Sequence, residues 1–249
     1  MQFIDTHIHL QDYKSSNATD IINAAIASGC KKLVCVSANV SDWEKVAVLC
    51  DEYPEVVVPA FGIHPWYAAE ATRDWKERLA VHLRRFPQAL IGECGIDLFK
   101  NKDITLQSEV FVEQIELAKS LERPLIVHAV RAQSWFQNNW DKMPEKFVIH
   151  SFGGSVEFLR QIMARGGYVG LSALSLRKQA LPEILAAVNP QRLLVETDAP
   201  SQSLQRGKEG QPQEVAQIIA TLEKISDKAW ATQIYQNSEE FIGCQYHQD

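Results

Sequence analysis

The stretch FIDTHIHL, residues 3–10, opens the chain with an apolar, β-branched run that is typical of a buried strand. The residues that follow it, HIHLQDY at positions 7–13, contain no glycine. An open doubly wound α/β sheet usually carries a glycine-rich turn directly after its first strand. The sequence at this turn therefore favours a (β/α)₈ barrel over an open sheet.

The rest of the chain repeats the same alternation of short β-branched runs and amphipathic stretches, which is typical of parallel βαβ units. After the last strand, residues 212–226 and 227–243 predict a closing helix and one additional helix. No Gly/Ser-rich linker interrupts the chain, so we expect one α/β TIM-barrel domain over residues 1–249. The predicted strands are residues 2–8, 32–37, 56–62, 89–95, 124–129, 146–151, 167–172 and 192–197.

Composition restricts the class of protein. Of the 249 residues, 46% are hydrophobic, but no apolar run approaches the roughly 20 residues of a membrane span. The N-terminus has no basic segment followed by an apolar one, so we expect a cytoplasmic protein with no membrane association and no obligate protein partner. The net charge of −6 means that a polyanionic substrate would need local help, such as bound cations.

Two common nucleophile arrangements are disfavoured. The five cysteines form no CxxC pair, which argues against a thiolate zinc site, and nothing marks Cys94 as an exposed nucleophile. No GxSxG motif is present, so serine hydrolysis is also disfavoured.

Histidines and carboxylates instead gather at the ends of the predicted strands. Barrel enzymes carry their chemistry at the carboxyl ends of the strands, and side chains two residues apart on a strand share a face. Imidazole and carboxylate together suit Zn, Mn or Fe. The pattern therefore predicts a site for one or two divalent cations. The residues at these positions are His7, His9, His64, Glu93, His128, His150 and Asp198.

Two further carboxylates share these faces. Asp5 lies two residues before His7, and Glu196 two residues before Asp198. We expect a supporting role for both, in which the carboxylate accepts a hydrogen bond from a ligand imidazole or from a backbone amide.

These segments, in this order, resemble the TatD family of metal-dependent hydrolases, within the amidohydrolase-like barrel superfamily. The resemblance runs over nearly the whole chain. It implies a metallo-dependent hydrolase barrel, divalent metal dependence and hydrolysis of DNA phosphodiester bonds, as in a deoxyribonuclease. It rests on FIDTHIHL, GIHP, IGECGID, PLIVHA, HSFGGS followed by GGYVGLS, and LLVETDAP followed by RGKEGQP.

The resemblance also implies a role for each site residue. His7, His9, Glu93 and Asp198 correspond to ligands of one metal ion, and Glu93, His128 and His150 to ligands of a second, so that Glu93 bridges two ions of Zn, Mn or Mg. Two such ions can activate a water and stabilise the leaving oxygen. Glu93 and Asp198 are then the catalytic residues, with Asp198 as the general base.

The sequence departs from the family pattern where substrate would bind. Trp66 replaces the second histidine of HPH, and Val130 stands where HxR has its arginine, with Arg131 one place later. In RGKEGQP, Glu209 and Gly210 replace an Arg-Asn pair. Neither valine nor glutamate can bind phosphate bidentately as arginine does. The predicted substrate contacts are His64, Trp66 and Arg206, and Trp66 could stack a nucleobase.

Three functions stay open at this point. The first is hydrolysis of nucleic-acid phosphodiesters, with DNA as the substrate. The second keeps the metal site but acts on a small phosphoester, another ester, a lactone or an amide. The negative net charge and the loss of expected phosphate-binding residues favour this second function. The third is a non-catalytic scaffold, which we disfavour because every predicted ligand is present.

Overall fold

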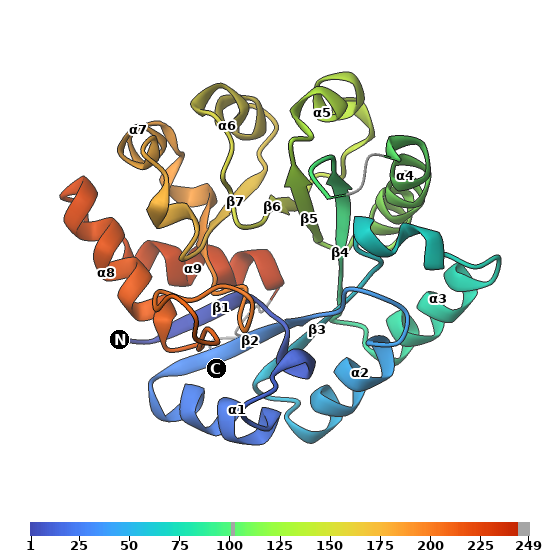
Figure 1. The fold of residues 1–249 in the computed structure, drawn as a ribbon, viewed down its shortest axis with the longest axis horizontal. Coiled ribbons are helices and arrows are strands. Elements are labelled where there is room, and N and C mark those ends of the chain that lie inside the picture. The colour runs from blue at the N-terminus through green and yellow to red at the C-terminus, as the bar shows by residue number, and fades with distance from the viewer. Residues whose placement is uncertain (101–102, 244–249) are drawn as a thin grey trace, which may run out of the picture. The chain divides into compact units, whose positions relative to one another are not determined.

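The structure is a computed structural model that describes residues 1–100 and 103–243. Strands and helices alternate along this part of the chain (Figure 1). The strands are β1 (Phe3–Ile8), β2 (Cys30–Val36), β3 (Val57–Phe61), β4 (Leu90–Asp97), β5 (Leu125–Val130), β6 (Phe147–Ile149), β7 (Tyr168–Leu171) and β8 (Leu193–Val195). Each lies within or overlaps a predicted strand.

The α-helices are α1 (Ala18–Ala27), α2 (Trp43–Glu52), α3 (Trp75–Arg85), α4 (Ile104–Ser120), α5 (Gln133–Asn139), α6 (Val156–Met163), α7 (Leu181–Ala187), α8 (Glu214–Ser226) and α9 (Ala231–Ile242). Short 3₁₀ turns are η1 (Leu10–Asp12), η2 (Pro65–Glu70), η3 (Trp140–Lys142), η4 (Ser175–Arg177) and η5 (Pro190–Arg192). Helices α8 and α9 correspond to the closing helix and the additional helix that the sequence predicts.

The strand ends differ from the prediction in ways that matter for the site. Strand β4 continues to Asp97, two residues further than expected, whereas β6 and β8 stop at Ile149 and Val195. Ser151 and Asp198 have positive φ angles of 43° and 54°, which end the extended conformation after these short strands. The expectation that Glu196 and Asp198 share one strand face is therefore wrong, because β8 has ended before either residue.

The chain divides into two compact units. The central unit comprises residues 35–150, and its strands β3 to β6 pair in parallel with their neighbours in chain order. Helices α2 to α5 lie on the outer side of these strands (Figure 1). The carboxyl ends of the four strands consequently lie at one edge of this sheet.

The terminal unit comprises residues 1–34 together with the chain from residue 151 onward, described to residue 243. Strands β7 and β8 pair in parallel, and a parallel bridge joins Ile8 to Ala199. Helix α9 packs against β1 and β8, and buries Phe241 completely. The end of β1 and the segment after β8 thereby lie side by side.

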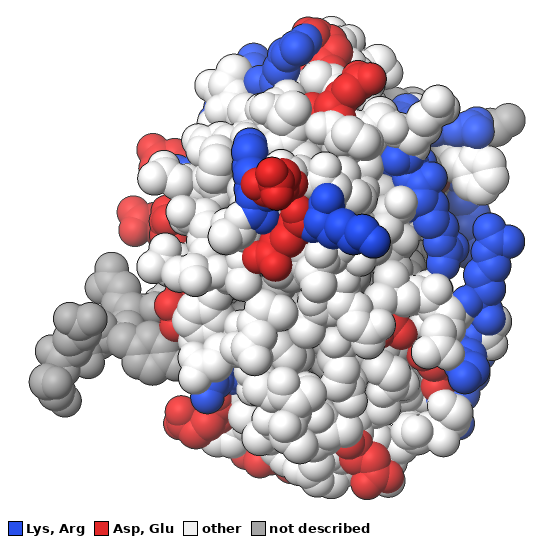
Figure 2. All heavy atoms as spheres, turned by 90° about the vertical axis from the view of Figure 1, so that its left-hand side faces the viewer, with Lys and Arg blue, Asp and Glu red and all other residues white. Residues whose placement is uncertain are grey.

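The structure also bears on three expectations from composition, namely those about membrane spans, cysteines and surface charge. Within the described residues, no helix combines the length and the apolar character needed to cross a bilayer. Cys30, Cys35, Cys50 and Cys94 are buried, and burial holds the pKa of Cys94 well above that of an ordinary thiol, which makes it a poor nucleophile. Cys244 lies outside the described residues. Figure 2 shows acidic and basic side chains on the same face, with neither sign covering it.

Candidate metal centres

The central unit gathers four predicted site residues around one carboxylate oxygen, in what we call the central cluster: His64, Glu93, His128 and His150. Glu93 Oε1 lies 2.9 Å from His128 Nδ1, 2.7 Å from His150 Nε2 and 3.5 Å from His64 Nε2. The Glu93 side chain is only 4% exposed. These residues come from β4, β5 and the segments after β3 and β6, so chain positions 64 to 150 converge on one point.

A second carboxylate, that of Asp97, orients this cluster. Asp97 Oδ2 lies 3.2 Å from His128 Nε2, which leaves His128 Nδ1 facing Glu93. Burial alone would lower the pKa of His128, but the hydrogen bonds to Asp97 and Glu93 outweigh it and raise that pKa. Burial would raise the pKa of Asp97, yet hydrogen bonds from His128 and from neighbouring donors hold it well below its usual range. Asp97 thus remains a carboxylate that fixes the ring orientation of His128.

The backbone around the central cluster is tightly constrained. A Cβ atom at Gly95 would lie 2.0 Å from the carbonyl oxygen of His128, and Gly95 adopts a φ of +141°. Only glycine therefore allows β4 to approach β5 this closely between Glu93 and Asp97. The Gln114 amide binds both Ile63 N (2.8 Å) and Ile63 O (3.1 Å), which anchors the segment that carries His64.

The terminal unit holds a second group, the terminal cluster, made of His7, His9 and Asp198. The Nε2 atoms of His7 and His9 are 3.2 Å apart, because the side chains of residues two apart point to the same side of β1. Asp198 Oδ1 lies 3.6 Å from His7 Nε2 and 3.4 Å from His9 Nε2. The Asp198 side chain is 14% exposed and is therefore accessible to water.

Contacts on both sides of Asp198 set its position. Its backbone N–H donates to His7 O at 2.9 Å, and its left-handed φ is one that aspartate tolerates. The Gln202 side-chain amide donates to Asp198 Oδ2, so Oδ1 is the oxygen that faces the imidazoles. The same amide donates to Ser151 Oγ at 2.8 Å.

Asp5 and Glu196 support the backbone of the terminal unit. Asp5 accepts hydrogen bonds from Thr197 N (3.0 Å), Thr197 Oγ1 (2.5 Å) and His7 N (3.3 Å). Burial raises the pKa of Asp5 to about 7, although the Thr197 hydrogen bonds oppose that shift. Glu196 accepts hydrogen bonds from Ser151 N and Thr6 Oγ1. In these contacts both carboxylates bind backbone amides or hydroxyls, in line with the supporting role expected of them.

The spacing of the nitrogen and oxygen atoms suits metal ions. Ligand atoms at about 2.1 Å from a tetrahedral Zn²⁺ lie about 3.4 Å from one another. Separations in the terminal cluster run from 3.2 to 3.6 Å, and those around Glu93 from 2.7 to 3.5 Å. His7, His9 and Asp198 form one group with metal-ligand spacing, and His64, Glu93 and His128 form another. Both donor sets therefore fit a divalent cation.

The structure brings the six predicted metal ligands into these two clusters, and it adds His64 to the central one. The prediction that His64 contacts substrate is untested and stays a prediction. Trp66 is 42% exposed, and its indole N–H donates to Asp97 Oδ2 at 2.6 Å. Arg206 is exposed in the loop after β8.

The residues that depart from the family pattern have structural partners. Glu209 accepts hydrogen bonds from Lys14 N at 3.0 Å and from Ser15, which lowers the pKa of Glu209. Gly210 O accepts a hydrogen bond from Tyr13 Oη at 2.7 Å, and a Cβ atom at Gly210 would lie 1.8 Å from Gln202 O. Glu209 and Gly210 therefore join the loop after β8 to the loop after β1.

Sequence reasoning missed Asp97 and Gln202. Period-two alternation from Glu93 through Gly95 would have placed Asp97 on the ligand face, had β4 been extended by two residues. Gln202 carried no signal in the sequence, because its contact with Asp198 depends on the turn that follows β8.

Parallel strands that alternate with helices and bear histidine–carboxylate clusters at their carboxyl ends define a barrel of the metallo-dependent hydrolase class. A family model described as TatD-related DNase matches residues 4–243, and the chain belongs to this family. The family prediction is confirmed.

Several curated relatives are similar over most of their length. Deoxyribonuclease Tat-D of Schizosaccharomyces pombe is 27% identical, with 92% of this chain and 87% of its own covered. The metal-dependent hydrolase YjjV of Escherichia coli K12 is 27% identical over 89% of each chain. The 3'-5' ssDNA/RNA exonuclease TatD of Escherichia fergusonii is 31% identical, covering 73% of this chain and 72% of its own.

Solved structures agree on the fold. The TatD homologue YjjV from Escherichia coli K12 superposes with a TM-score of 0.88 at 24% identity, covering 98% of both chains. A TatD-family hydrolase from Entamoeba histolytica gives a TM-score of 0.84 at 20% identity, covering 97% of this chain and 98% of its own. The predicted (β/α)₈-barrel fold is confirmed. That residues 1–249 act as one domain stays a prediction.

Proposed function

We propose that this protein is a metal-dependent phosphodiesterase that cleaves DNA, with one divalent ion at the central cluster and one at the terminal cluster. The observation that carries the proposal is Glu93 Oε1, which lies within 3.5 Å of three imidazole nitrogens in a buried site. Relatives named as a deoxyribonuclease and as a 3'-5' ssDNA/RNA exonuclease support the choice of substrate. That Glu93 also ligates the second ion stays a prediction.

The residues of the two clusters have different chemical roles in the proposed reaction. When bound, divalent ions would polarise a phosphoryl oxygen and lower the pKa of a water molecule. Asp198 has one oxygen facing His7 and His9 and a second held by Gln202, and its side chain reaches solvent. This carboxylate is suited to take a proton from the attacking water as the general base. Asp97 keeps His128 presenting Nδ1 to the central site.

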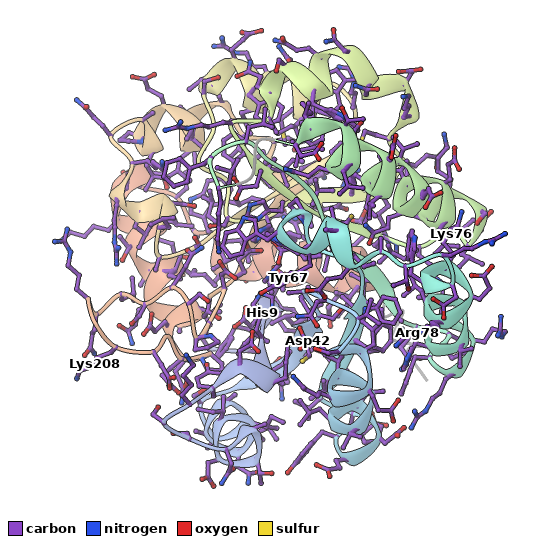
Figure 3. The ribbon with its side chains drawn as sticks, turned by 45° about the vertical axis from the view of Figure 1, so that its right-hand side comes forward. His9, Asp42, Tyr67, Lys76, Arg78 and Lys208 are labelled. Carbon is purple, nitrogen blue, oxygen red and sulfur yellow. The ribbon has the colours of Figure 1, made fainter. Side chains whose placement is uncertain are left out.

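A cavity in the terminal unit supports a phosphate contact by Arg206. The cavity has a volume of about 210 Å³, and its lining includes Arg206, Arg177, Lys208 and Gln202. Figure 3 shows Lys208 projecting from the loop after β8. Gln202, which lines this cavity, also donates a hydrogen bond to Asp198, so it connects the cavity to the proposed general base. Guanidinium groups there can bind phosphate oxygens through charge-assisted hydrogen bonds.

The proposal is tested with the purified full chain. The protein is stripped with a chelator, reloaded separately with Zn, Mn and Mg, and its metal content is measured by mass spectrometry. Each form is then assayed on single-stranded DNA, single-stranded RNA and bis(p-nitrophenyl) phosphate. We expect up to two ions per chain and metal-dependent release of nucleotides from DNA.

The alternative function uses the same clusters on a small ester, lactone or amide. Two observations favour it, namely the net charge of −6 and the presence of Val130 at the end of β5 in place of a phosphate-binding arginine. A panel of such substrates is assayed beside the nucleic acids. If DNA and RNA stay intact with every metal while a member of that panel is hydrolysed, the alternative replaces the proposed function.

A further inference from the structure

Two exposed aromatic residues, Trp66 and Phe99, are hydrogen-bonded to Asp97, and a cation lies over each of their rings. The Trp66 ring lies 4.6 Å from that of His64 in the central cluster, between centroids. Trp66 is 42% exposed and Phe99 is 65% exposed. Lys100 Nζ lies 3.4 Å from the centroid of the Trp66 ring, and Arg131 Cζ lies 4.7 Å from that of Phe99. We call Trp66, Phe99, Lys100 and Arg131 the aromatic ledge.

We propose that the aromatic ledge is the subsite that selects single-stranded nucleic acid, with bases stacking on Phe99 and Trp66 and the flanking phosphates binding Arg131 and Lys100. This inference rests on the proposed function, whose substrate class it narrows.

The ledge is built onto the strands that carry the central cluster. Leu98 N donates to Val130 O at 3.0 Å, which continues the β4–β5 pairing beyond Asp97 and sets residues 99 and 100 beside Arg131. The arginine that is displaced by one position from the family pattern thus reaches an exposed aromatic ring.

Asp97 links the ledge to the predicted metal ligands. Its Oδ1 accepts hydrogen bonds from Phe99 N at 2.8 Å and Lys100 N at 2.9 Å. Its Oδ2 accepts the Trp66 indole N–H at 2.6 Å and lies 3.2 Å from His128 Nε2. A single buried carboxylate therefore holds the Trp66 ring and the Phe99 backbone at fixed places relative to His128. A strand stacked on the ledge would lie next to His128 of the central cluster.

The cations can exchange with bases. An exposed cation–π contact changes an equilibrium by about 2- to 5-fold, whereas stacking of a base on an aromatic side chain changes affinity by about 5- to 150-fold. A base can consequently replace the ammonium over Trp66 or the guanidinium over Phe99. Among the described residues, no salt bridge joins Lys100 or Arg131 to a carboxylate, so a released cation can turn to the phosphate of the incoming nucleotide.

The geometry favours single strands because stacking requires a free base face. Bases within a duplex are stacked on their neighbours, and only unpaired bases can be splayed onto protein side chains. The ledge therefore distinguishes an unpaired strand from a duplex, which the phosphate contacts alone would not do.

The test measures binding of the metal-loaded full chain to a fluorescent phosphorothioate (dT)₈ strand that resists cleavage. An abasic strand of the same length and a duplex are the comparison ligands. Phe99→Ala and Arg131→Ala are compared with wild type, with Phe99→Trp as the conservative variant. The matched controls are Val81→Ala, which also truncates an exposed apolar side chain, and Arg78→Ala; both residues lie on α3, from which Figure 3 shows Arg78 projecting outward.

We expect Phe99→Ala to raise the Kd for (dT)₈ by at least 5-fold, because the bases of this strand stack on Phe99. The Kd for the abasic strand, which has no bases to stack, should stay unchanged. Phe99→Trp should keep wild-type affinity. Arg131→Ala should weaken both strands and reduce the slope of log Kd against log salt by about one. Neither control should change either Kd by more than about 2-fold.

The proposal is overturned if wild type binds neither strand, if it binds (dT)₈ and the abasic strand equally, or if Phe99→Ala leaves the ratio of the two Kd values unchanged. Parallel hydrolysis assays on bis(p-nitrophenyl) phosphate and DNA distinguish failure of the ledge proposal from failure of the proposed function. A wild-type protein that discriminates between the strands but hydrolyses no phosphodiester with any metal overturns the proposed function alone. A wild-type protein that cleaves DNA but binds (dT)₈ and the abasic strand with equal Kd overturns the ledge proposal alone.

Discussion

The central and terminal clusters use the same residue types but are constructed differently. The central cluster draws one residue from each of four chain segments, and its carboxylate is 4% exposed among three imidazoles. The terminal cluster takes two histidines from a single strand and adds Asp198 from a loop, with 14% of that side chain exposed.

This difference suggests different tasks for the two clusters. Asp97, a charged partner, orients His128 in the central cluster, whereas Gln202, a neutral amide, holds Asp198 in the terminal one. Because the central cluster offers three imidazoles and a buried carboxylate, against two imidazoles and one carboxylate in the terminal cluster, we expect the central cluster to hold its ion more firmly. We expect the terminal cluster, which is open to water, to carry the proton transfer.

The largest expected effect is that of Glu93→Ala. Removal of the carboxylate leaves three imidazoles without the anion that they share, so we expect the central ion to be lost and hydrolysis to fall below detection. Metal analysis and a DNA cleavage assay measure both. Asp42→Ala is the matched control, since Asp42 is a buried carboxylate of the same unit (Figure 3) that binds Ala38 N and Lys45 instead. Retention of the metal by Glu93→Ala would contradict the role of the central cluster.

Asp198→Asn is expected to lower kcat by about 100- to 10,000-fold, because general-base catalysis contributes a factor of this size. The amide is isosteric but cannot take the proton from water. The ion of the central cluster should remain bound. If metal analysis instead found that Asp198→Asn releases the ion of the central cluster, the assignment of Asp198 to the terminal cluster alone would be wrong.

Asp97→Asn should reduce metal affinity or activity by about 10- to 100-fold, the usual size of effects from residues that orient a ligand histidine. The asparagine can still bind one partner, but it no longer offers a charged acceptor to His128 Nε2. A chelator titration that follows ion release gives the affinity. An unchanged titration would mean that the hydrogen bond to Asp97 does not tighten the central site.

Gln202→Ala is the corresponding change in the terminal cluster and should have the smallest effect, about 5-fold on kcat. A hydrogen bond to a charged group contributes about 1.5 to 3 kcal/mol, but water can replace most of it at a side chain that is already partly exposed. Steady-state kinetics on DNA measure it beside Asp97→Asn. A loss larger than that of Asp97→Asn would reverse the proposed ranking of the two clusters.

The sequence anticipated much of this arrangement. Regular spacing of β-branched runs located the strands, and the alternation in FIDTHIHL alone was enough to put His7 and His9 on one side of β1. Asp97 was missed because the expected strand ended at Gly95, and periodicity does not reveal that backbone pairing with β5 carries the strand two residues further. Gln202 was missed because no periodic pattern applies to a loop.

The fold class and the residue types at the strand ends can be predicted from sequence, because both follow from local periodicities that each segment carries. Which of those side chains contact one another depends on the three-dimensional fold. It united His64 with Glu93, His128 and His150, turned Asp198 Oδ1 toward His7 and His9, and set Arg131 over Phe99. These contacts join residues that are distant in the chain, and their geometry depends on strand register and loop conformation, which pattern does not encode.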